Sequence, residues 1–232
     1  MENYLERTQM LYGKDAVEKL ERAKVAVFGV GGVGGYVVEA LVRSGIGQLD
    51  LFDSDTVAVS NLNRQIIATA ETVGQVKTDA AKARAASINP SCKVNSNRVL
   101  YLPANADEYD LSQYDYVVDA VDNVSAKIEL AVRCERLGVP LISSMGTGNK
   151  LHPELLQIAD IYKTSVCPLA RVMRRELKKR GVRGLRCVYS TEQPRECGVD
   201  ADGKRCPASN AFVPATAGLI IASCIVNELT GN

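Results

Sequence analysis

The chain has 232 residues, of which 46% are hydrophobic and 24% charged, a length and composition typical of one well-packed globular domain. Its formal net charge of +1 excludes binding to nucleic acid or membrane through overall charge, so either partner needs a local patch. A single histidine excludes sites built from several histidines. The seven cysteines are scattered, with no C-x-x-C pair and no signal peptide, so we expect reduced thiols in a cytoplasmic protein.

The N-terminal region predicts helix, then strand, then a glycine-rich loop. Apolar residues among charges over 3–20 favour one leading helix or two short ones. The apolar run 25–28 predicts a strand, and 36–44 predicts a helix. The sequence between them fits the fingerprint G-x-G-x-x-G, with glycines at Gly29, Gly31, Gly32 and Gly34. Glycines there permit a tight turn and let backbone N–H groups approach a phosphate at the positive end of a helix.

Strands and helices then alternate along the chain. Apolar runs predict strands at 48–52, 94–100, 116–120 and 140–143. The segments 77–88 and 125–137 predict helices, the first ended by Asn-Pro and the second by Gly138. This order predicts an α/β fold, a Rossmann-like and mainly parallel sheet with helices on both faces. A nucleotide is therefore expected at the carboxyl ends of the strands.

The pattern is looser after Met145. It predicts strands at 155–159 and 185–189, a basic helix at 168–179, a polar loop at 191–210 and an apolar terminal helix at 211–226. The terminal stretch is only about 16 residues long and contains Pro214, so it favours a buried helix over a membrane span. No linker interrupts the chain, and we interpret 1–232 as a single domain.

Charged residues after the glycine loop help to distinguish an ATP site from an NAD site. Asp53 ends a predicted strand about 20 residues past the glycines, where a carboxylate binds ribose hydroxyls in NAD enzymes and ATP enzymes alike. Arg64 and Lys77 follow it, and two cations there suit a triphosphate. A dinucleotide-binding module or NAD-dependent reductase would leave both cations unexplained.

A second acidic motif, D-A-V-D-N, follows the predicted strand 116–120. Asp122 can hold Mg²⁺ on the phosphates, with water completing the coordination shell. Its alternative role is a favourable charge near the start of the next helix. Asp119 can ligate the metal too, or simply cap the turn. Together with the cations, these residues favour an ATP site over a hydride-transfer site.

The glycine loop, the S-N-L-N-R-Q block at 60–65, Lys77 and the D-x-x-D-N block at 119–123 resemble the ThiF/MoeB/HesA superfamily of ubiquitin-activating-type adenylating enzymes. The resemblance covers nearly the whole chain. It implies ATP and Mg²⁺ as cofactors, and a homodimer in which Arg7 reaches the ATP of the partner. It implies catalytic roles for Arg7, Arg64, Lys77 and Asp122, with Asp122 as the metal ligand. It further implies nucleotide contacts from Gly29, Gly31, Gly32, Gly34, Asp53, Asp55, Asn61, Arg64, Gln65, Lys77 and Asn123.

Within this superfamily the chain resembles the branch of tRNA threonylcarbamoyladenosine dehydratases at 7–13, 29–35, 63–66, 168–177, 188–192 and 206–218. That branch adenylates the threonine carboxylate, after which a nitrogen of the same substituent displaces AMP and closes a ring. Residues 1–145 would then form the nucleotide-binding half, and 146–232 the half that contacts substrate and dimer partner. The stretch 143–148 is expected on the acyl side of the pocket.

The main alternative is adenylation of the C-terminus of a ubiquitin-like sulfur-carrier protein, with the same ATP site. Members that activate such carriers typically have two C-x-x-C pairs for a structural zinc. Here Cys187, Cys197 and Cys206 are nine or more residues apart, which counts against that branch. A sulfur-transfer protein remains a possible partner in either case.

Basic residues concentrate in the predicted helix 168–179 and just beyond it. Arg171, Arg174, Arg175 and Lys178 share one helical face. The alternative interpretation is a solvated charged face with no ligand. In a chain of nearly neutral charge, this face is the one we predict to contact the tRNA backbone.

Overall fold

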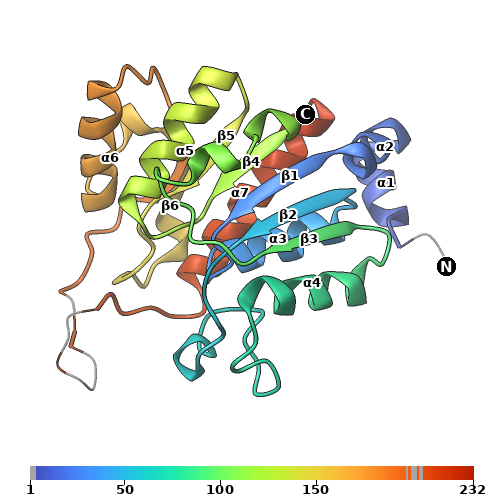
Figure 1. The fold of residues 1–232 in the computed structure, drawn as a ribbon, viewed down its shortest axis with the longest axis horizontal. Helices are drawn as coiled ribbons and strands as arrows, with labels where there is room; N and C mark the ends of the chain where they lie inside the picture. Colours follow the sequence, from blue (N-terminus) through green and yellow to red (C-terminus); the bar gives the residue numbers. More distant parts are fainter. Residues whose placement is uncertain (1–3, 197, 200–202, 204–205) are drawn as a thin grey trace.

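The computed structural model describes residues 4–196, 198–199, 203 and 206–232. Its described residues form a seven-stranded sheet in the order β3-β2-β1-β4-β5-β7-β6 (Figure 1). All neighbouring strands are parallel except β6, which runs antiparallel to β7 at the edge. The strands are β1 Lys24–Phe28, β2 Gln48–Phe52, β3 Lys93–Asn97, β4 Tyr116–Asp119, β5 Leu141–Ser144, β6 Leu156–Asp160 and β7 Arg186–Ser190.

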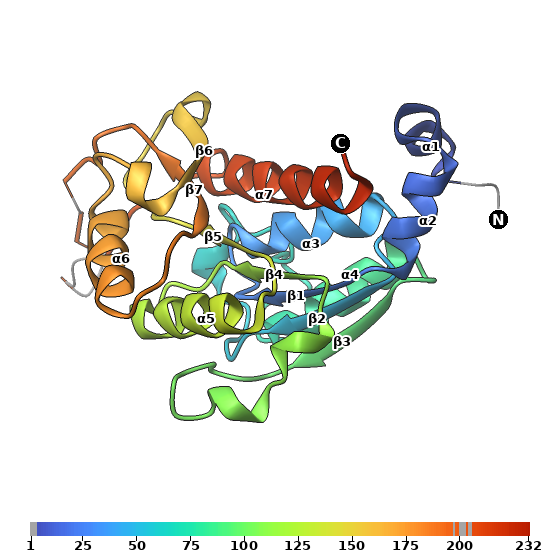
Figure 2. The same cartoon turned by 90° about the horizontal axis from the view of Figure 1, so that it is seen from above.

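Helices cover both faces of this sheet, as predicted. Figure 2 shows α3 and α7 on one face and α5 on the other. The α-helices are α1 Glu6–Tyr12, α2 Lys14–Arg22, α3 Gly34–Arg43, α4 Lys77–Ile88, α5 Val124–Leu137, α6 Pro168–Lys179 and α7 Val213–Thr230. Short 3-10 turns are η1 Val59–Asn61, η2 Ala106–Glu108, η3 Leu111–Gln113, η4 Pro153–Leu155 and η5 Ile161–Lys163. The Rossmann-like α/β fold is therefore confirmed.

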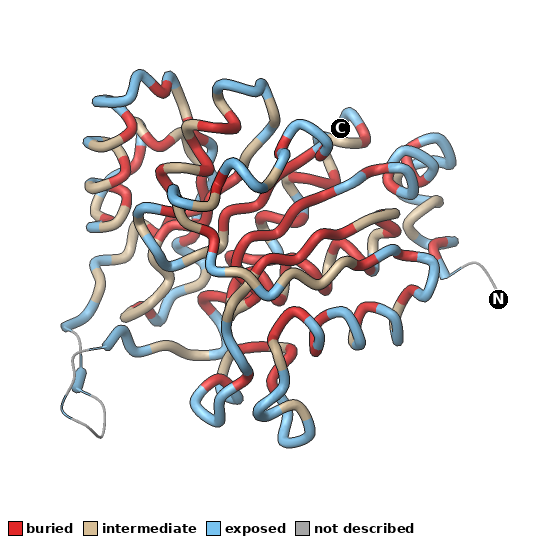
Figure 3. Tube along the Cα trace, viewed as in Figure 1, coloured by how far each residue is buried: buried red, intermediate tan, exposed pale blue. Residues whose placement is uncertain are grey.

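The central strands are buried on both faces, which explains why they are continuous apolar runs. Along β1, Val25 and Val27 belong to the core formed with α3, α4 and α7. Ala26 and Phe28 alternate with them and join the core under α5. Phe28 stacks on Phe52 of β2 with a centroid distance of 4.4 Å. Figure 3 shows these strands as the buried centre of the molecule.

Several element boundaries differ from the prediction. The strand predicted at 94–100 ends at Asn97, because β2, with which it pairs, ends at Phe52 in the paired register. The leading region forms two helices, separated at Gly13, whose φ of 87° an L side chain rarely adopts. α3 begins two residues earlier than predicted, at Gly34 within the glycine loop. The predicted polar loop 191–210 includes residues outside the described part of the chain.

The terminal helix α7 is longer than predicted and closes one face of the core. It begins where the Asn210 carboxamide oxygen accepts the backbone N–H groups of Phe212 and Val213. It ends at Gly231, which adopts the left-handed conformation. By length and composition α7 could cross a membrane, but half of it is buried inside the protein. At Gly218 it approaches α3 so closely that a Cβ would lie 2.4 Å from the Val33 carbonyl oxygen.

This close approach predicts the effect of Gly218→Ala. Alanine normally favours a helix interior by about 1 kcal/mol over glycine. Here the added methyl group must push α7 away from α3, so we expect a net loss of about 1–3 kcal/mol in the free energy of unfolding. Chemical denaturation checks this. Ser223→Ala, on the exposed side of the same helix, serves as control and should change stability by less than about 0.5 kcal/mol. An equally stable Gly218→Ala protein would contradict the packing described.

Candidate active site

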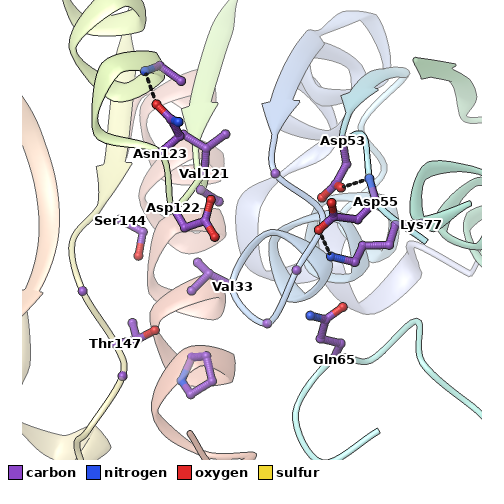
Figure 4. A pocket seen from close by; sticks show the side chains of 18 of the residues that line it. Val33, Asp53, Asp55, Gln65, Lys77, Val121, Asp122, Asn123, Ser144 and Thr147 are labelled. Carbon is purple, nitrogen blue, oxygen red and sulfur yellow. Dashed lines mark hydrogen bonds and ion pairs between the residues drawn. The ribbon is translucent and has the colours of Figure 1, made fainter. Parts of the chain in front are cut away.

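A cavity of about 560 Å³ lies where β1, β2, β4 and β5 end, at the carboxyl edge of the sheet (Figure 4). The glycine loop forms its floor. Asp53, Asp55 and Lys77 lie on one side of that loop, and Asp122 and Asn123 on the other. The predicted position of the site at the strand ends is therefore confirmed.

Two glycines of the loop, Gly29 and Gly34, have no room for a side chain. A Cβ on Gly29 would lie 2.5 Å from the Ala120 carbonyl oxygen, and Gly29 also has a φ of 86°. A Cβ on Gly34 would lie 1.8 Å from the Gly29 carbonyl oxygen. Gly31 and Gly32 line the cavity, and Gly34 lies behind them at the start of α3. The loop thus brings bare backbone and a helix N-terminus to the cavity, the arrangement that binds phosphate.

The carboxylate of Asp53 is held rigidly at the end of β2. Its Oδ2 accepts the backbone N–H of Val30 in the glycine loop at 2.7 Å, and its Oδ1 accepts that of Asp55 at 2.9 Å. The hydrogen bond from Val30 attaches Asp53 to the glycine loop, as expected for a carboxylate that lies beside this loop in the folded chain.

The two predicted cations both line the cavity. Lys77 begins α4, and its Nζ lies 2.7 Å from Asp55 Oδ2, with only 8% of the side chain exposed. Arg64 Nη1 donates to the carbonyl oxygen of Ser60 and to Asn63 Oδ1, both at 2.9 Å. Each cation is therefore held by protein oxygens at the cavity wall, where a phosphate anion can compete for it.

Asn61 and Gln65 belong to the same wall. Asn61 Oδ1 accepts the Ala58 N–H at 3.0 Å and shapes the turn that carries Arg64. Gln65 is buried, and its Oε1 has no hydrogen-bond partner although its residue lines the cavity. A buried amide oxygen without a partner costs free energy unless a ligand or water satisfies it. This atom is therefore a specific indication that a polar ligand belongs in the cavity.

The motif that follows β4 separates into structural and cavity-facing residues. Asp122 is exposed and lines the cavity. Asn123 lines it too, but its side-chain oxygen caps α5 by accepting the Ala126 N–H at 3.0 Å. Asp119 is fully buried, and both of its oxygens accept from Lys127 Nζ at 2.9 Å. The structure therefore assigns Asp119 to an internal ion pair and leaves Asp122 to face a ligand.

Lys127 was missed by the sequence analysis. Its signal was available: Lys127, Leu130, Ala131 and Cys134 lie three or four residues apart, and all four are buried on the inner face of α5. A lysine among such positions indicates a buried partner for its charge. The hydroxyl of Ser143 on β5 also donates to Asp119.

Residues 144–148 of the stretch predicted for the acyl side line the cavity, while their contact with an acyl group stays a prediction. Ser144 and Thr147 line the cavity on the side of Asp122, together with residues 145, 146 and 148 (Figure 4). Leu169, the second residue of α6, lines the same side. Ser143 is the exception within 143–148, because it is fully buried against Asp119. Nearby Pro207 and Ser209 also line the cavity.

Arg7 does not lie at this cavity. It is exposed on α1 and is absent from the cavity wall. Figures 1 and 2 both place α1 at the end of the molecule opposite α6. Any contact of Arg7 with a nucleotide therefore needs a second copy of the chain, and this contact stays a prediction.

The basic face of α6 is only partly free. Arg171, Arg175 and Lys178 are exposed, but Arg174 is half-buried and its Nη1 donates to the Thr164 carbonyl oxygen at 3.0 Å. Arg174 is thereby fixed to the turn before α6. Hydrogen bonds from Arg180, Lys179 and Arg175 hold the pKa of Glu176 down at about 2, so its charge offsets part of the basic surface.

Comparison with known proteins agrees with this geometry. The model of the ThiF family matches residues 5–231. A curated relative from Bacillus subtilis (strain 168), named tRNA threonylcarbamoyladenosine dehydratase, is 43% identical over 96% of this chain and 93% of its own length. The structure of E. coli TcdA, a tRNA N6-threonylcarbamoyladenosine dehydratase, in complex with ATP superposes with a TM-score of 0.88 at 35% identity, covering 97% of this chain and 93% of that one. A sulfur carrier protein adenylyltransferase from Thermus thermophilus matches only 56% of this chain and 48% of its own length, at 39% identity.

Proposed function

Because this chain belongs to the ThiF family, and within it to the tRNA threonylcarbamoyladenosine dehydratases, we propose that it converts tRNA threonylcarbamoyladenosine to its cyclic form at the expense of ATP. One observation carries the proposal. The glycine loop, the carboxylate of Asp53 and two cations all line one cavity. Ser144 and Thr147 line a separate side of the same cavity. A nucleotide and an acyl group can therefore meet between Lys77 and Asp122.

The proposed reaction has two steps. A threonine carboxylate oxygen attacks the α-phosphorus of ATP, the bond to the pyrophosphate leaving group breaks, and an acyl-adenylate forms. A nitrogen of the same substituent then attacks the activated carbonyl carbon and loses its proton to solvent, while AMP leaves with the former carboxylate oxygen. The net change in the tRNA is the loss of one water. Ring closure is intramolecular and needs no nucleophile from the protein.

The residues of the cavity fit ATP. Gln65 Oε1 lacks a partner, and a donor of ATP, such as the adenine amino group or a ribose hydroxyl, can satisfy it. The glycine loop leaves the space that phosphates need, and Arg64 and Lys77 supply positive charge beside it. Asp53, already oriented by Val30, would hold the ribose.

Asp122 would hold Mg²⁺, which neutralises phosphate charge when it is bound. A single protein carboxylate suffices there, because Mg²⁺ keeps several waters and takes further oxygens from phosphates. The carboxylate is exposed at the cavity wall, and Asn123 fixes the turn that carries it. The Asp122 carboxylate is thus the kind of hard oxygen donor that this ion prefers.

We place the tRNA across α6. Leu169 at the start of this helix lines the acyl side of the cavity, and Arg171, Arg175 and Lys178 are exposed further along it. Arg174 completes the predicted face but is tied to Thr164. A tRNA whose phosphate backbone binds along these side chains would bring its modified base to the mouth of the cavity. The other proposed features are a cytoplasmic homodimer with Arg7 acting at the partner's site, and a sulfur-transfer protein as possible partner.

Replacement of the proposed metal ligand tests the chemistry. In Asp122→Ala, the cavity loses the carboxylate that holds Mg²⁺, so pyrophosphate release with modified tRNA should fall at least about 100-fold. The melting temperature should stay unchanged because Asp122 is exposed. Asp15→Ala on α2, also exposed, is the matched control and should keep full activity.

Substrate identity is tested in the same assay. Wild-type protein should release pyrophosphate with tRNA that carries threonylcarbamoyladenosine and not with unmodified tRNA. Release only with a ubiquitin-like carrier protein would replace the proposal by the carrier-activating alternative. Oxidation of NADH without any dependence on ATP would contradict adenylation altogether.

Charge reversal on α6 tests the tRNA surface. The variant Arg171→Glu/Lys178→Glu should weaken tRNA binding about tenfold or more and reduce the salt dependence, because two phosphate contacts are lost. Its ATP affinity should equal that of wild type. The matched control Lys14→Glu/Lys19→Glu makes the same charge change on exposed positions of α2, at the other end of the molecule. Equal tRNA affinity of the two variants would show that α6 is not the binding surface.

A further inference from the structure

A completely buried ion pair lies directly beneath the cavity. Lys127 on α5 and Asp119 at the end of β4 are both 0% exposed. Lys127 Nζ is 2.9 Å from each carboxylate oxygen of Asp119, and the Ser143 hydroxyl on β5 donates to the same carboxylate. We call these three residues the buried joint. It connects β4, β5 and α5 at the edge of the sheet that carries the site.

The buried joint is bonded to the turn that presents Asp122. Asp119 Oδ1 accepts the Val121 N–H at 3.3 Å, one residue before Asp122. On the other side of Asp122, Asn123 is held by its cap on α5. Asp122 is therefore an exposed residue between two fixed neighbours. Its carboxylate can approach a ligand only in the orientation that this turn imposes.

The same turn determines the position of the glycine loop. The Ala120 N–H donates to the Phe28 carbonyl oxygen at 2.8 Å, and its own carbonyl oxygen lies against Gly29 with no space for a Cβ. A shift of the turn would therefore move Asp122 relative to the phosphate-binding backbone. The two halves of the cavity meet at this contact.

Stability alone does not account for a charged pair in this place. Removing two charges from water costs several kcal/mol per ion in general, and well-packed apolar residues of similar volume often stabilise a protein equally well or better. A buried ion pair can instead serve to hold one local backbone geometry in preference to others. Here the geometry that the pair holds is that of a turn with a cavity-facing carboxylate.

We infer that Asp119, Lys127 and Ser143 are positioning residues, which set the Asp122 carboxylate at the distance from the glycine loop that MgATP requires. The inference rests on the proposed function. None of the three touches the ligand cavity, so their effect passes through Asp122. Partners of this kind, which orient a metal-binding group, typically change metal affinity 10- to 100-fold when they are removed.

The experiment separates positioning from folding. In Lys127→Met the Asp119 charge stays buried without its partner, so this variant should be unstable. The double variant Asp119→Leu/Lys127→Met removes both charges and should recover a cooperative thermal transition. Ser143→Ala keeps the ion pair and removes one donor, which provides a well-folded variant in any case. The matched control is Arg84→Met, which removes a cation 2.7 Å from the carboxylate of Glu39, away from the cavity wall.

The readout is ATP affinity by calorimetry, measured with Mg²⁺ and again with EDTA. We expect MgATP to bind at least about tenfold more weakly to the double variant, with a smaller loss in Ser143→Ala, while metal-free ATP binds all proteins about equally. Arg84→Met should bind MgATP like wild type even though it is less stable.

If wild type binds MgATP and both joint variants match it, the inference is overturned and the proposed function stands. If the double variant does not fold, the MgATP affinity of Ser143→Ala is the deciding measurement. A wild-type protein without MgATP affinity would overturn the proposed function and this inference together.

Discussion

The site depends on one close contact between backbones. β1 and β4 are neighbours in the sheet, and beyond their ends the glycine loop lies directly on the Ala120 peptide, so that Gly29 can carry no side chain. This contact brings the glycine-loop backbone and the turn of Asp122 to within reach of one ligand. The hydrogen bond from Val30 to Asp53 attaches the end of β2 to the same loop. The nucleotide site is therefore formed where three parallel strands, β1, β2 and β4, end at the same edge of the sheet.

The two sides of the cavity have different architectures. The side with Asp53 and Lys77 consists of strand ends and helix starts whose core packs on α7. The side with Ser144 and Thr147 consists of the segment after β5, the start of α6 and residues near Pro207. An adenylating enzyme must exclude water from its mixed anhydride, and a cavity with two walls of different construction suits that reaction.

Two buried thiols of the chain are poorly suited to covalent catalysis. Burial raises the pKa of Cys134 and of Cys187 to about 12, so both remain protonated at neutral pH. This agrees with a second step in which the substrate supplies its own nucleophile. The protein then contributes mainly position and charge.

The sequence was sufficient for the type and order of the main elements and for the residues at strand ends that line the cavity. Apolar runs such as β1 are continuous because they are buried on both faces, and Asp53 and Asp122 follow strand ends, where ligands bind. It was insufficient where the outcome depends on tertiary partners. The pairing of Lys127 with Asp119, and the bond that ties Arg174 to Thr164, need segments that are brought together only by folding. The end of β3 likewise depends on where its partner strand ends.

The most direct test of the account is mass spectrometry of tRNA nucleosides after incubation of the purified protein with ATP, Mg²⁺ and tRNA that carries threonylcarbamoyladenosine. If the protein is the proposed dehydratase, the modified nucleoside loses the mass of one water, and AMP and pyrophosphate appear in equal amounts with the cyclic product. An unchanged nucleoside in the presence of an active ATP site would contradict the central claim.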